Sequence, residues 1–262
     1  MKLNKFIKRA KEVPWVLGQR LTRKPIKSLS VISDLFIWRW SEDWDTYFEL
    51  IDIAALFGDD KKHTVDIIFF DQNGNEFHRQ FIDLNGLYRQ KINIYDLLLN
   101  INNVPGDYGT FAVFHQHTPN EVTEMDSYIA ERGYVSYRYK DLPLLTYVHG
   151  NMDAIDNTLT PLSGTSLLNR FYRLQYLMEM EKTYEIALIN SSPSTKKVKF
   201  IIMGNDNKIL FKKNAILGSK QVYLFPIMDL LEPSRLIIES KMVMARPVIF
   251  CFSAGAVDVF HG

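Results

Sequence analysis

The fold is indicated by residues 61–98, which read KKHTVDIIFFDQNGNEFHRQFIDLNGLYRQKINIYDLL. A second stretch with the same pattern, residues 196–231, reads KKVKFIIMGNDNKILFKKNAILGSKQVYLFPIMDLL. In both, an apolar run is followed by a turn, a return run and an Asp-Leu-Leu sequence. The apolar runs and the Asp-Leu-Leu sequences lie at the same offset in the chain, so we interpret the two stretches as copies of one unit.

Each copy is predicted to be a β unit. Side chains on a strand point alternately to two faces, so a strand with one buried face alternates apolar and polar residues. Phe77, Arg79 and Phe81 show this alternation, whereas residues 63–69 are apolar enough for a strand buried on both faces. Asn73-Gly74 lies between these runs, and Asn-Gly supplies the positive φ angles of a tight hairpin turn. We therefore expect a hairpin and a further strand in each copy.

This pattern predicts a mainly β protein, made of two tandem antiparallel β-sandwich-like repeats. The repeats are placed at 28–152 and 170–262, with a turn-rich linker at 153–169. A single closed barrel is the alternative arrangement.

The first repeat is expected to contain an insertion at about 99–131. Both repeats end in His-Gly, at His149-Gly150 and His261-Gly262, and this offset is shorter than that between the Asp-Leu-Leu sequences. Insertions in the loops of a repeated scaffold are places where a function can be added. The insertion is thus a candidate functional segment.

Charge is distributed unevenly along the chain. Residues 1–27 carry nine basic residues and one acidic residue, and the remainder carries 22 basic and 29 acidic residues. Apolar residues fall on one helical face before Pro14, which predicts a short basic amphipathic N-terminal helix. We expect this arm to bind an anionic membrane surface or an acidic protein, or else to pack on the body. Its charged positions are Lys2, Lys5, Lys8, Arg9 and Lys11.

Composition limits the class of protein. A hydrophobic content of 47% and a charged content of 23% are typical of a globular chain. Cys251 is the only cysteine, so no intrachain disulfide can form and nothing requires an oxidising compartment. No stretch resembles a signal peptide or a transmembrane helix. We expect a cytoplasmic protein, with peripheral attachment at the inner membrane face as an option, and no nucleic-acid binding.

Aromatic and acidic residues are interleaved at the start of the first repeat. Trp38, Trp40 and Trp44 lie near Asp43 in a region predicted to be strand, and His149 ends the same repeat. Aromatic rings can stack on the apolar faces of sugars, and carboxylates accept hydrogen bonds from hydroxyl groups. These residues are candidates for a carbohydrate site. The alternative is that the rings pack between two sheets, which is common for aromatic residues in strands.

The insertion contains Gly109, His115, His117 and Glu121, which resemble the first signature of the cupin family. In that signature a glycine precedes a His-x-His pair, and a glutamate follows. The resemblance implies a divalent metal held inside a β-barrel, and His149 is a candidate third nitrogen ligand. His-x-His places two imidazoles on one face of a strand, which suits metal binding.

The chain departs from the cupin pattern in two places. Tyr128 stands where a glycine is expected after the glutamate, and residues 143–149 do not match the second signature. No catalytic Gly-x-Ser-x-Gly, phosphate-binding glycine loop or Cys-x-x-Cys pair occurs.

We therefore expect a non-enzymatic binding or scaffold protein without a cofactor, which binds carbohydrate and serves surface-glycan assembly at the membrane. The alternatives are a cupin-like metal-dependent enzyme, which acts on a small or sugar substrate, and a homo-oligomeric structural β protein.

Overall fold

The computed structural model describes residues 31–56, 63–84, 89–116, 130–131, 133–150, 154–243 and 246–262. The predicted arm at 1–27 lies outside these ranges, as do His117 and Glu121. The described chain consists almost entirely of β-strands, which confirms the mainly β prediction.

The first half of the molecule contains two short helices, α2 (Ile53–Leu56) and α3 (Ile94–Leu99). Its strands are β1 (Ile32–Asp34), β2 (Phe36–Arg39), β3 (Trp44–Ile51), β4 (His63–Asp71), β5 (Glu76–Leu84), β6 (Arg89–Asn93), β7 (Tyr108–His115), β8 (Ala130–Glu131), β9 (Tyr134–Tyr139), β10 (Thr146–His149) and β11 (Ala154–Asp156).

The second half is built from strands within the described residues. They are β12 (Thr165–Arg173), β13 (Thr183–Ile189), β14 (Lys196–Met203), β15 (Ile209–Leu217), β16 (Val222–Ile227), β17 (Arg235–Met242), β18 (Val248–Ser253) and β19 (Ala256–His261).

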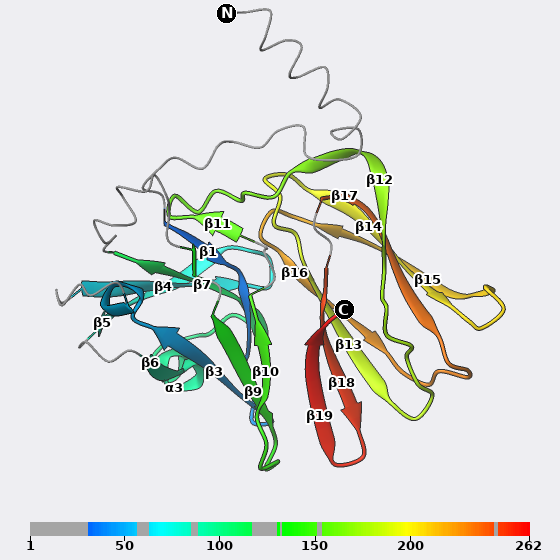
Figure 1. Ribbon diagram of the computed structural model, residues 1–262, viewed down its shortest axis with the longest axis horizontal. Coiled ribbons are helices and arrows are strands. Elements are labelled where there is room, and N and C mark those ends of the chain that lie inside the picture. The colour runs from blue at the N-terminus through cyan, green and yellow to red at the C-terminus, as the bar shows by residue number, and fades with distance from the viewer. Residues whose placement is uncertain are drawn as a thin grey trace, which may run out of the picture.

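The two halves have the same strand order. In the first half, one sheet has the order β6-β3-β9-β10 and the other β2-β7-β4-β5. In the second half, the corresponding orders are β16-β13-β18-β19 and β12-β17-β14-β15, and all of these pairings are antiparallel. A small third sheet, β11-β1-β8, belongs to the first half and includes one parallel pairing. Figure 1 shows the halves side by side, with β10 and β19 between them.

The predicted hairpins are present. In the β4–β5 turn, Gly74 has a φ of 84°, and the Asp71 carboxylate accepts hydrogen bonds from the backbone N–H groups of Asn73 and Asn75 at 2.8 Å. In the β14–β15 turn, Asn207 takes the positive φ of 62°. A positive φ is favourable for Gly and tolerated by Asn, which explains the composition of both turns. The Asp-Leu-Leu sequences differ, because the first lies in α3 and the second, at 229–231, has no regular structure.

Part of the expected insertion belongs to the scaffold. Residues 108–115 lie within 99–131, but they form β7, which pairs with both β2 and β4. The expected linker at 153–169 likewise contains β11 and the start of β12. The place of β7 in a sheet depends on β2 and β4, which are distant in the sequence, so its role in the scaffold becomes visible only through these partners.

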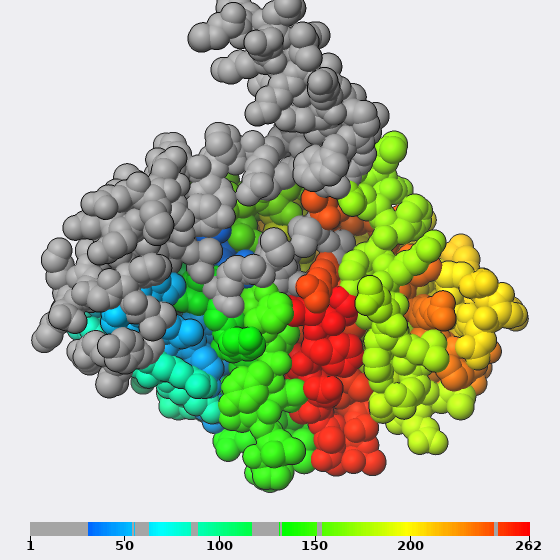
Figure 2. All heavy atoms as spheres, viewed as in Figure 1, coloured from blue at the N-terminus to red at the C-terminus, as the bar shows by residue number. Residues whose placement is uncertain are grey.

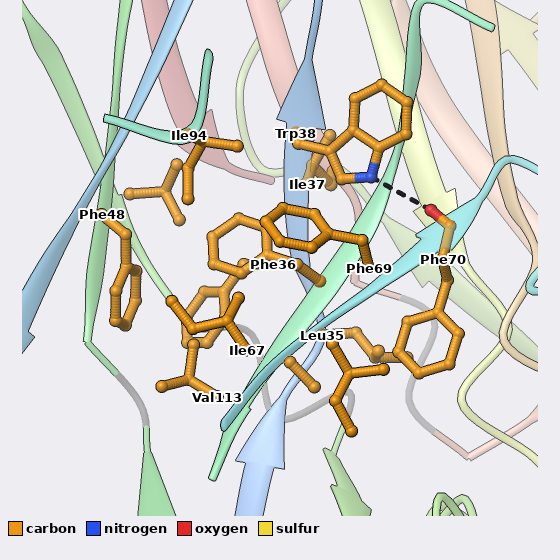
Figure 3. Packing of buried hydrophobic residues seen from close by; sticks show 14 of the residues in the cluster. Leu35, Phe36, Ile37, Trp38, Phe48, Ile67, Phe69, Phe70, Ile94 and Val113 are labelled. Atoms are coloured by element: carbon orange, nitrogen blue, oxygen red, sulfur yellow. Dashed lines mark hydrogen bonds between the residues drawn. The ribbon is translucent and has the colours of Figure 1, made fainter. Parts of the chain in front are cut away.

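One apolar core joins the two halves. It contains side chains from β2, β3, β4, β7 and β9, together with residues of the second half, and Figure 3 labels members from β2, β3, β4 and β7. The second-half members are Ala187, Ile189, Val222, Val248, Phe250 and Val259. A second core lies within the other half and includes Tyr184, Ile186, Phe200, Leu236 and Ile238. The β16-β13-β18-β19 sheet therefore contributes to both cores, one from each of its faces.

A buried arginine lies where the halves meet. Arg39 of β2 forms an ion pair with Glu185 of β13. Its guanidinium carbon lies 4.5 Å from the ring centroid of Trp44 and 5.1 Å from that of Phe250, in cation–π geometry. The charge is thus compensated by a carboxylate and by two aromatic faces.

Candidate functional site

The predicted tryptophans mostly lie in the core. Trp38 is fully buried, and Trp44 is buried with its ring 5.5 Å from that of Phe250. Trp40 is half-buried and contacts the Tyr95 ring edge-on, at 6.1 Å between centroids. Asp43 is exposed in the turn before β3. Trp38 and Trp44 therefore pack between sheets, as the alternative interpretation of the sequence expected, and neither offers a ring face to a ligand.

The described histidines of the predicted metal site lie in different sheets. His115 ends β7, is buried, and has its Nε2 2.8 Å from Oε2 of Glu131. His149 ends β10, and its Nδ1 donates to the Gly150 carbonyl oxygen at 2.6 Å. Across the described ranges, no group of three or more His, Cys, Asp or Glu side chains could hold a metal ion. His117 and Glu121 lie outside the described residues, so the metal site stays a prediction, and we derive no chemistry from it.

Gly109, the first residue of the cupin-like pattern, has a packing role. A Cβ atom at this position would lie 2.7 Å from the Trp38 ring and closer still to the Phe70 carbonyl oxygen. Real Cβ atoms do not approach other atoms this closely, so only glycine leaves room for the tryptophan. The glycine is explained by close approach of side chain and backbone.

An open aromatic surface lies on the outer face of the β6-β3-β9-β10 sheet. Tyr147 and Tyr47 are paired on either side of Ser136 in the central strand β9. Tyr134 lies two residues before Ser136 and therefore on the same face. Tyr134 is 50% exposed and Tyr147 46% exposed, while Tyr47 is half-buried. We call Tyr47, Tyr134 and Tyr147 the tyrosine face. In Figure 2, the first half forms a green and blue surface beside the red C-terminal strands.

Charged pairs hold the surroundings of the tyrosine face in place. Nε of Arg138 donates to Oδ2 of Asp45 at 2.7 Å, and Nε of Arg89 donates to Oε2 of Glu49 at 2.8 Å. The Arg138–Asp45 pair is accessible to solvent and adds little stability, but it fixes the positions of polar atoms that a ligand could contact. In the second pair Arg89 is exposed, whereas the Glu49 carboxylate is buried. The tyrosine face thus has a polar rim on two sides.

Lys91 and Tyr47 form a further contact at this surface. The Lys91 ammonium lies 4.2 Å from the centroid of the Tyr47 ring. Burial, followed by the negative charge of Asp45, raises the pKa of the Tyr47 phenol above its ordinary value. The phenol therefore keeps its proton at neutral pH and remains a hydrogen-bond donor.

A pair of histidines lies at the edge of this sheet, where the two halves meet. The rings of His149 and His261 are 4.6 Å apart, and Nε2 of His261 donates to the His149 carbonyl oxygen at 2.7 Å. Burial is the main reason that the pKa of His261 is lowered from 6.5 to about 4. His261 is therefore neutral near pH 7, and in that form its proton is on Nε2.

The lowered pKa of His261 predicts a loss of stability in mild acid. The unfolded chain binds a proton near pH 6.5, whereas the folded chain binds it only near pH 4. The unfolded state therefore holds more protons in this window, and the free energy of unfolding should decrease as the pH falls through it. Urea denaturation at successive pH values measures this dependence. In His261→Gln the slope should be reduced, and an unchanged slope would contradict the assignment.

The tyrosine face was not identified in the sequence. The alternation of Tyr134, Ser136 and Arg138 marks one face of a strand, but it does not say whether that face is covered. Tyr47 and Tyr147 join Tyr134 only through the pairing of β3 and β10 with β9. Strand pairing, and not local sequence, brings the three rings together.

Comparisons with known proteins do not identify a family. No protein-family model matches the sequence, and no curated protein is similar to it. Among solved structures, a β-glucuronidase from glycoside hydrolase family 2 matches 87% of this chain and 23% of its own, with 10% identity and a TM-score of 0.20. A calcium-binding mutant of Bacteroides uniformis β-glucuronidase 2 matches 87% and 25%, with 16% identity and a TM-score of 0.18. The chain spans about a quarter of their length, and TM-scores this low carry no argument about function.

The two described helices, α2 and α3, are short. No helix within the described residues has both the length and the apolar composition that crossing a bilayer requires.

Proposed function

We propose that this protein is a non-enzymatic binding protein that holds carbohydrate on the tyrosine face. The observation that supports this proposal is the group of three tyrosines on an open sheet face, with two of the rings about half exposed. Large aromatic side chains are usually buried, so a cluster left open on a sheet indicates a contact surface.

The chemistry of the tyrosine face suits a sugar. Tyrosine combines an apolar ring with a hydroxyl group, and it loses little conformational entropy when a ligand binds. Strands are about 4.8 Å apart, which puts the Tyr47 and Tyr147 backbones about 10 Å apart across β9. A ligand that spans them needs apolar faces between polar groups, and carbohydrates have this character. Asp45 supplies an acceptor for hydroxyl groups.

Glycan binding tests this function. On a glycan array, and then by calorimetry with the best ligand, Tyr134→Ala and Tyr147→Ala should each weaken binding by about three- to tenfold, the effect expected for one aromatic contact. Tyr134→Phe keeps the ring and should retain most of the affinity, because stacking depends on the ring.

Phe81→Ala is the matched control. Phe81 is an exposed aromatic residue on β5, in the other sheet of the same half. Its removal should leave glycan binding unchanged. The proposal fails if the wild-type protein binds no glycan, or if Phe81→Ala weakens binding as much as the tyrosine variants do.

We further propose that the two halves are copies of one unit. The shared strand order supports this, as does the pairing of His63 with Leu84 in β4–β5 and of Lys196 with Leu217 in β14–β15. These two pairs occupy equivalent places in their hairpins. The proposal extends the duplication inferred from the sequence to the whole sandwich.

Three expectations from the sequence stay predictions. A role in glycan assembly at the membrane depends on the arm at 1–27, which lies outside the described residues. Homo-oligomerisation would use an exposed sheet edge, and β15 is such an edge, with exposed Phe211 and Ile216. The cupin-like enzyme finds no support from the described histidines.

A further inference from the structure

Positive charge is concentrated in the second half of the molecule. Residues 165–262 carry 13 basic and 8 acidic residues, whereas residues 28–164 carry 9 basic and 21 acidic residues. Much of this positive charge gathers on the β12-β17-β14-β15 sheet. In the first half, the equivalent sheet has apolar Ile68, Phe70, Ala112 and Phe114 buried on its corresponding face. The two halves therefore use this face differently.

A hollow lies over the basic sheet. It has a volume of about 690 Å³ and is open to solvent. Its lining includes Lys196, Lys197, Lys199, Lys241, Asn169 and Asn214. Four lysines and two asparagines thus line one hollow, and all of these side chains can donate hydrogen bonds.

Lys196 is the most unusual member of the lining. It is only 6% exposed, and its ammonium group donates to the Ser194 hydroxyl. Among the described residues, no carboxylate forms an ion pair with Lys196. Burial, followed by the charge of Lys241, lowers the pKa of the Lys196 ammonium. A buried ammonium without an acidic partner is costly, and an anion beside it would remove that cost.

The loop that carries Ser194 is held firmly in place. Nδ2 of Asn190 donates to the carbonyl oxygens of Ser194, Leu217 and Gly218 at 2.9–3.0 Å. The Ser192 hydroxyl donates to Oδ1 of Asn190 at 2.6 Å. This network fixes the connection between β13 and β14 next to Lys196, so the position of the ammonium group is defined by the fold.

The acidic residue of the hollow is already paired. Oε2 of Glu239 accepts a hydrogen bond from the Lys199 ammonium at 2.7 Å, and Oε1 accepts one from Asn169 at 2.7 Å. Glu239 therefore compensates Lys199. Within the described residues, Lys196, Lys197 and Lys241 form no ion pair with a carboxylate. They leave a net positive charge in the hollow.

The equivalent position in the first half has an acidic side chain beside it. Lys196 occupies the place of His63, since Lys196 pairs with Leu217 as His63 pairs with Leu84. Nε2 of His63 lies 3.2 Å from Oδ1 of buried Asp52. The first half thus places an acidic side chain, Asp52, beside His63. Among the described residues of the second half, no carboxylate forms an ion pair with Lys196.

We propose that the hollow bordered by Lys196, Lys197 and Lys241 binds the phosphate group of an anionic ligand. Lysine binds phosphate as a point charge, and several lysines together match its double negative charge. The Asn214 amide can donate to a remaining oxygen. The site is separate from the tyrosine face, which lies on a different sheet, so the proposal does not depend on carbohydrate binding.

Two probes distinguish the source of the phosphate group. The first is inorganic pyrophosphate, titrated into the full chain by calorimetry. The second is sedimentation with phosphatidylcholine vesicles that contain or lack phosphatidic acid. Binding should weaken as salt is added, because the contact is between charges. Because residues 1–27 are also basic, vesicle binding is assigned to the hollow only where a variant of the hollow reduces it.

Lys196→Met is the main variant, and Lys208→Gln is its matched control. Methionine removes the charge and keeps an unbranched side chain, so the fold should be retained, and Lys241→Gln gives a second variant at a more exposed position. Loss of one charge-assisted hydrogen bond should weaken binding by at least about tenfold.

Lys208 lies in the β14–β15 turn, outside the hollow. Its substitution removes the same charge and should change affinity by less than about twofold.

The outcomes of the two binding experiments support or overturn the proposed phosphate site as follows. Pyrophosphate binding that Lys196→Met or Lys241→Gln weakens supports a soluble phosphate compound. Binding to phosphatidic acid vesicles alone, weakened by the same variants, supports a lipid headgroup. The proposal is overturned if the wild-type protein binds neither probe, or if Lys208→Gln weakens binding as much as Lys196→Met does.

Discussion

Replacing Trp38 with alanine should lower the free energy of unfolding by about 4 kcal/mol, within the range for large aromatic residues in cores. Trp38 is fully buried, and its ring contacts Phe77 edge-on at 5.9 Å between centroids. Its Nε1 donates to the carbonyl oxygens of Phe70 at 3.0 Å and Thr110 at 3.1 Å. Alanine would leave a cavity and remove both hydrogen bonds. Urea denaturation with a two-state fit measures the difference.

Two further variants test the reason for this effect. Trp38→Phe fills part of the space but cannot donate, so it should cost less than alanine and more than about 1 kcal/mol. Gly109→Ala would push against the same ring and the Phe70 carbonyl oxygen, and should also destabilise, by about 1–3 kcal/mol. A Trp38→Ala loss below about 1 kcal/mol would show that this part of the core is not packed as described.

Replacing Arg39 with alanine should destabilise the contact between the two halves by about 2–3 kcal/mol. Removal of one partner from a fully buried ion pair costs about 3–5 kcal/mol. Glu185 is partly exposed, at 29% of its side chain, so water can solvate part of the carboxylate that is left behind. The loss of the cation–π contacts with Trp44 and Phe250 adds to the cost.

A double-mutant cycle isolates the Arg39–Glu185 pair. Glu185→Gln keeps a hydrogen-bond acceptor and should cost less than Arg39→Ala. If the ion pair matters, Arg39→Ala combined with Glu185→Gln should cost less than the sum of the two single changes. Strict additivity would show that Arg39 acts only through its contacts with the rings.

The β character of the chain could be predicted because it depends on local patterns. The Asn73-Gly74 turn between two runs with apolar residues is a property of neighbouring residues, and the β4–β5 hairpin follows from it. β7 was harder to place, because its position in the sheet depends on β2 and β4, which are distant in the sequence. The segment was assigned to an insertion because the two His-Gly sequences lie at a shorter offset than the two Asp-Leu-Leu sequences.

The candidate sites could be predicted less well than the fold. Trp38 and Tyr147 are both aromatic residues in strands, yet one is fully buried and the other is half exposed. The difference lies in what covers each strand, and a single sequence does not contain this information. Lys196 also looks like an ordinary surface lysine in a basic run. Its burial, and the absence of a paired acid among the described residues, become visible only once β14 is placed in its sheet.

The core shared between the halves has a consequence for how the chain can be divided. Ala187, Ile189, Val248 and Phe250 complete the core of the first half, although they belong to the second. If the chain were cut between β11 and β12, the first-half fragment would expose to water the core residues that pack against these four side chains. Such a fragment would be prone to aggregate. Although the strand orders of the halves match, neither half is self-sufficient, and the whole chain should melt in one cooperative step.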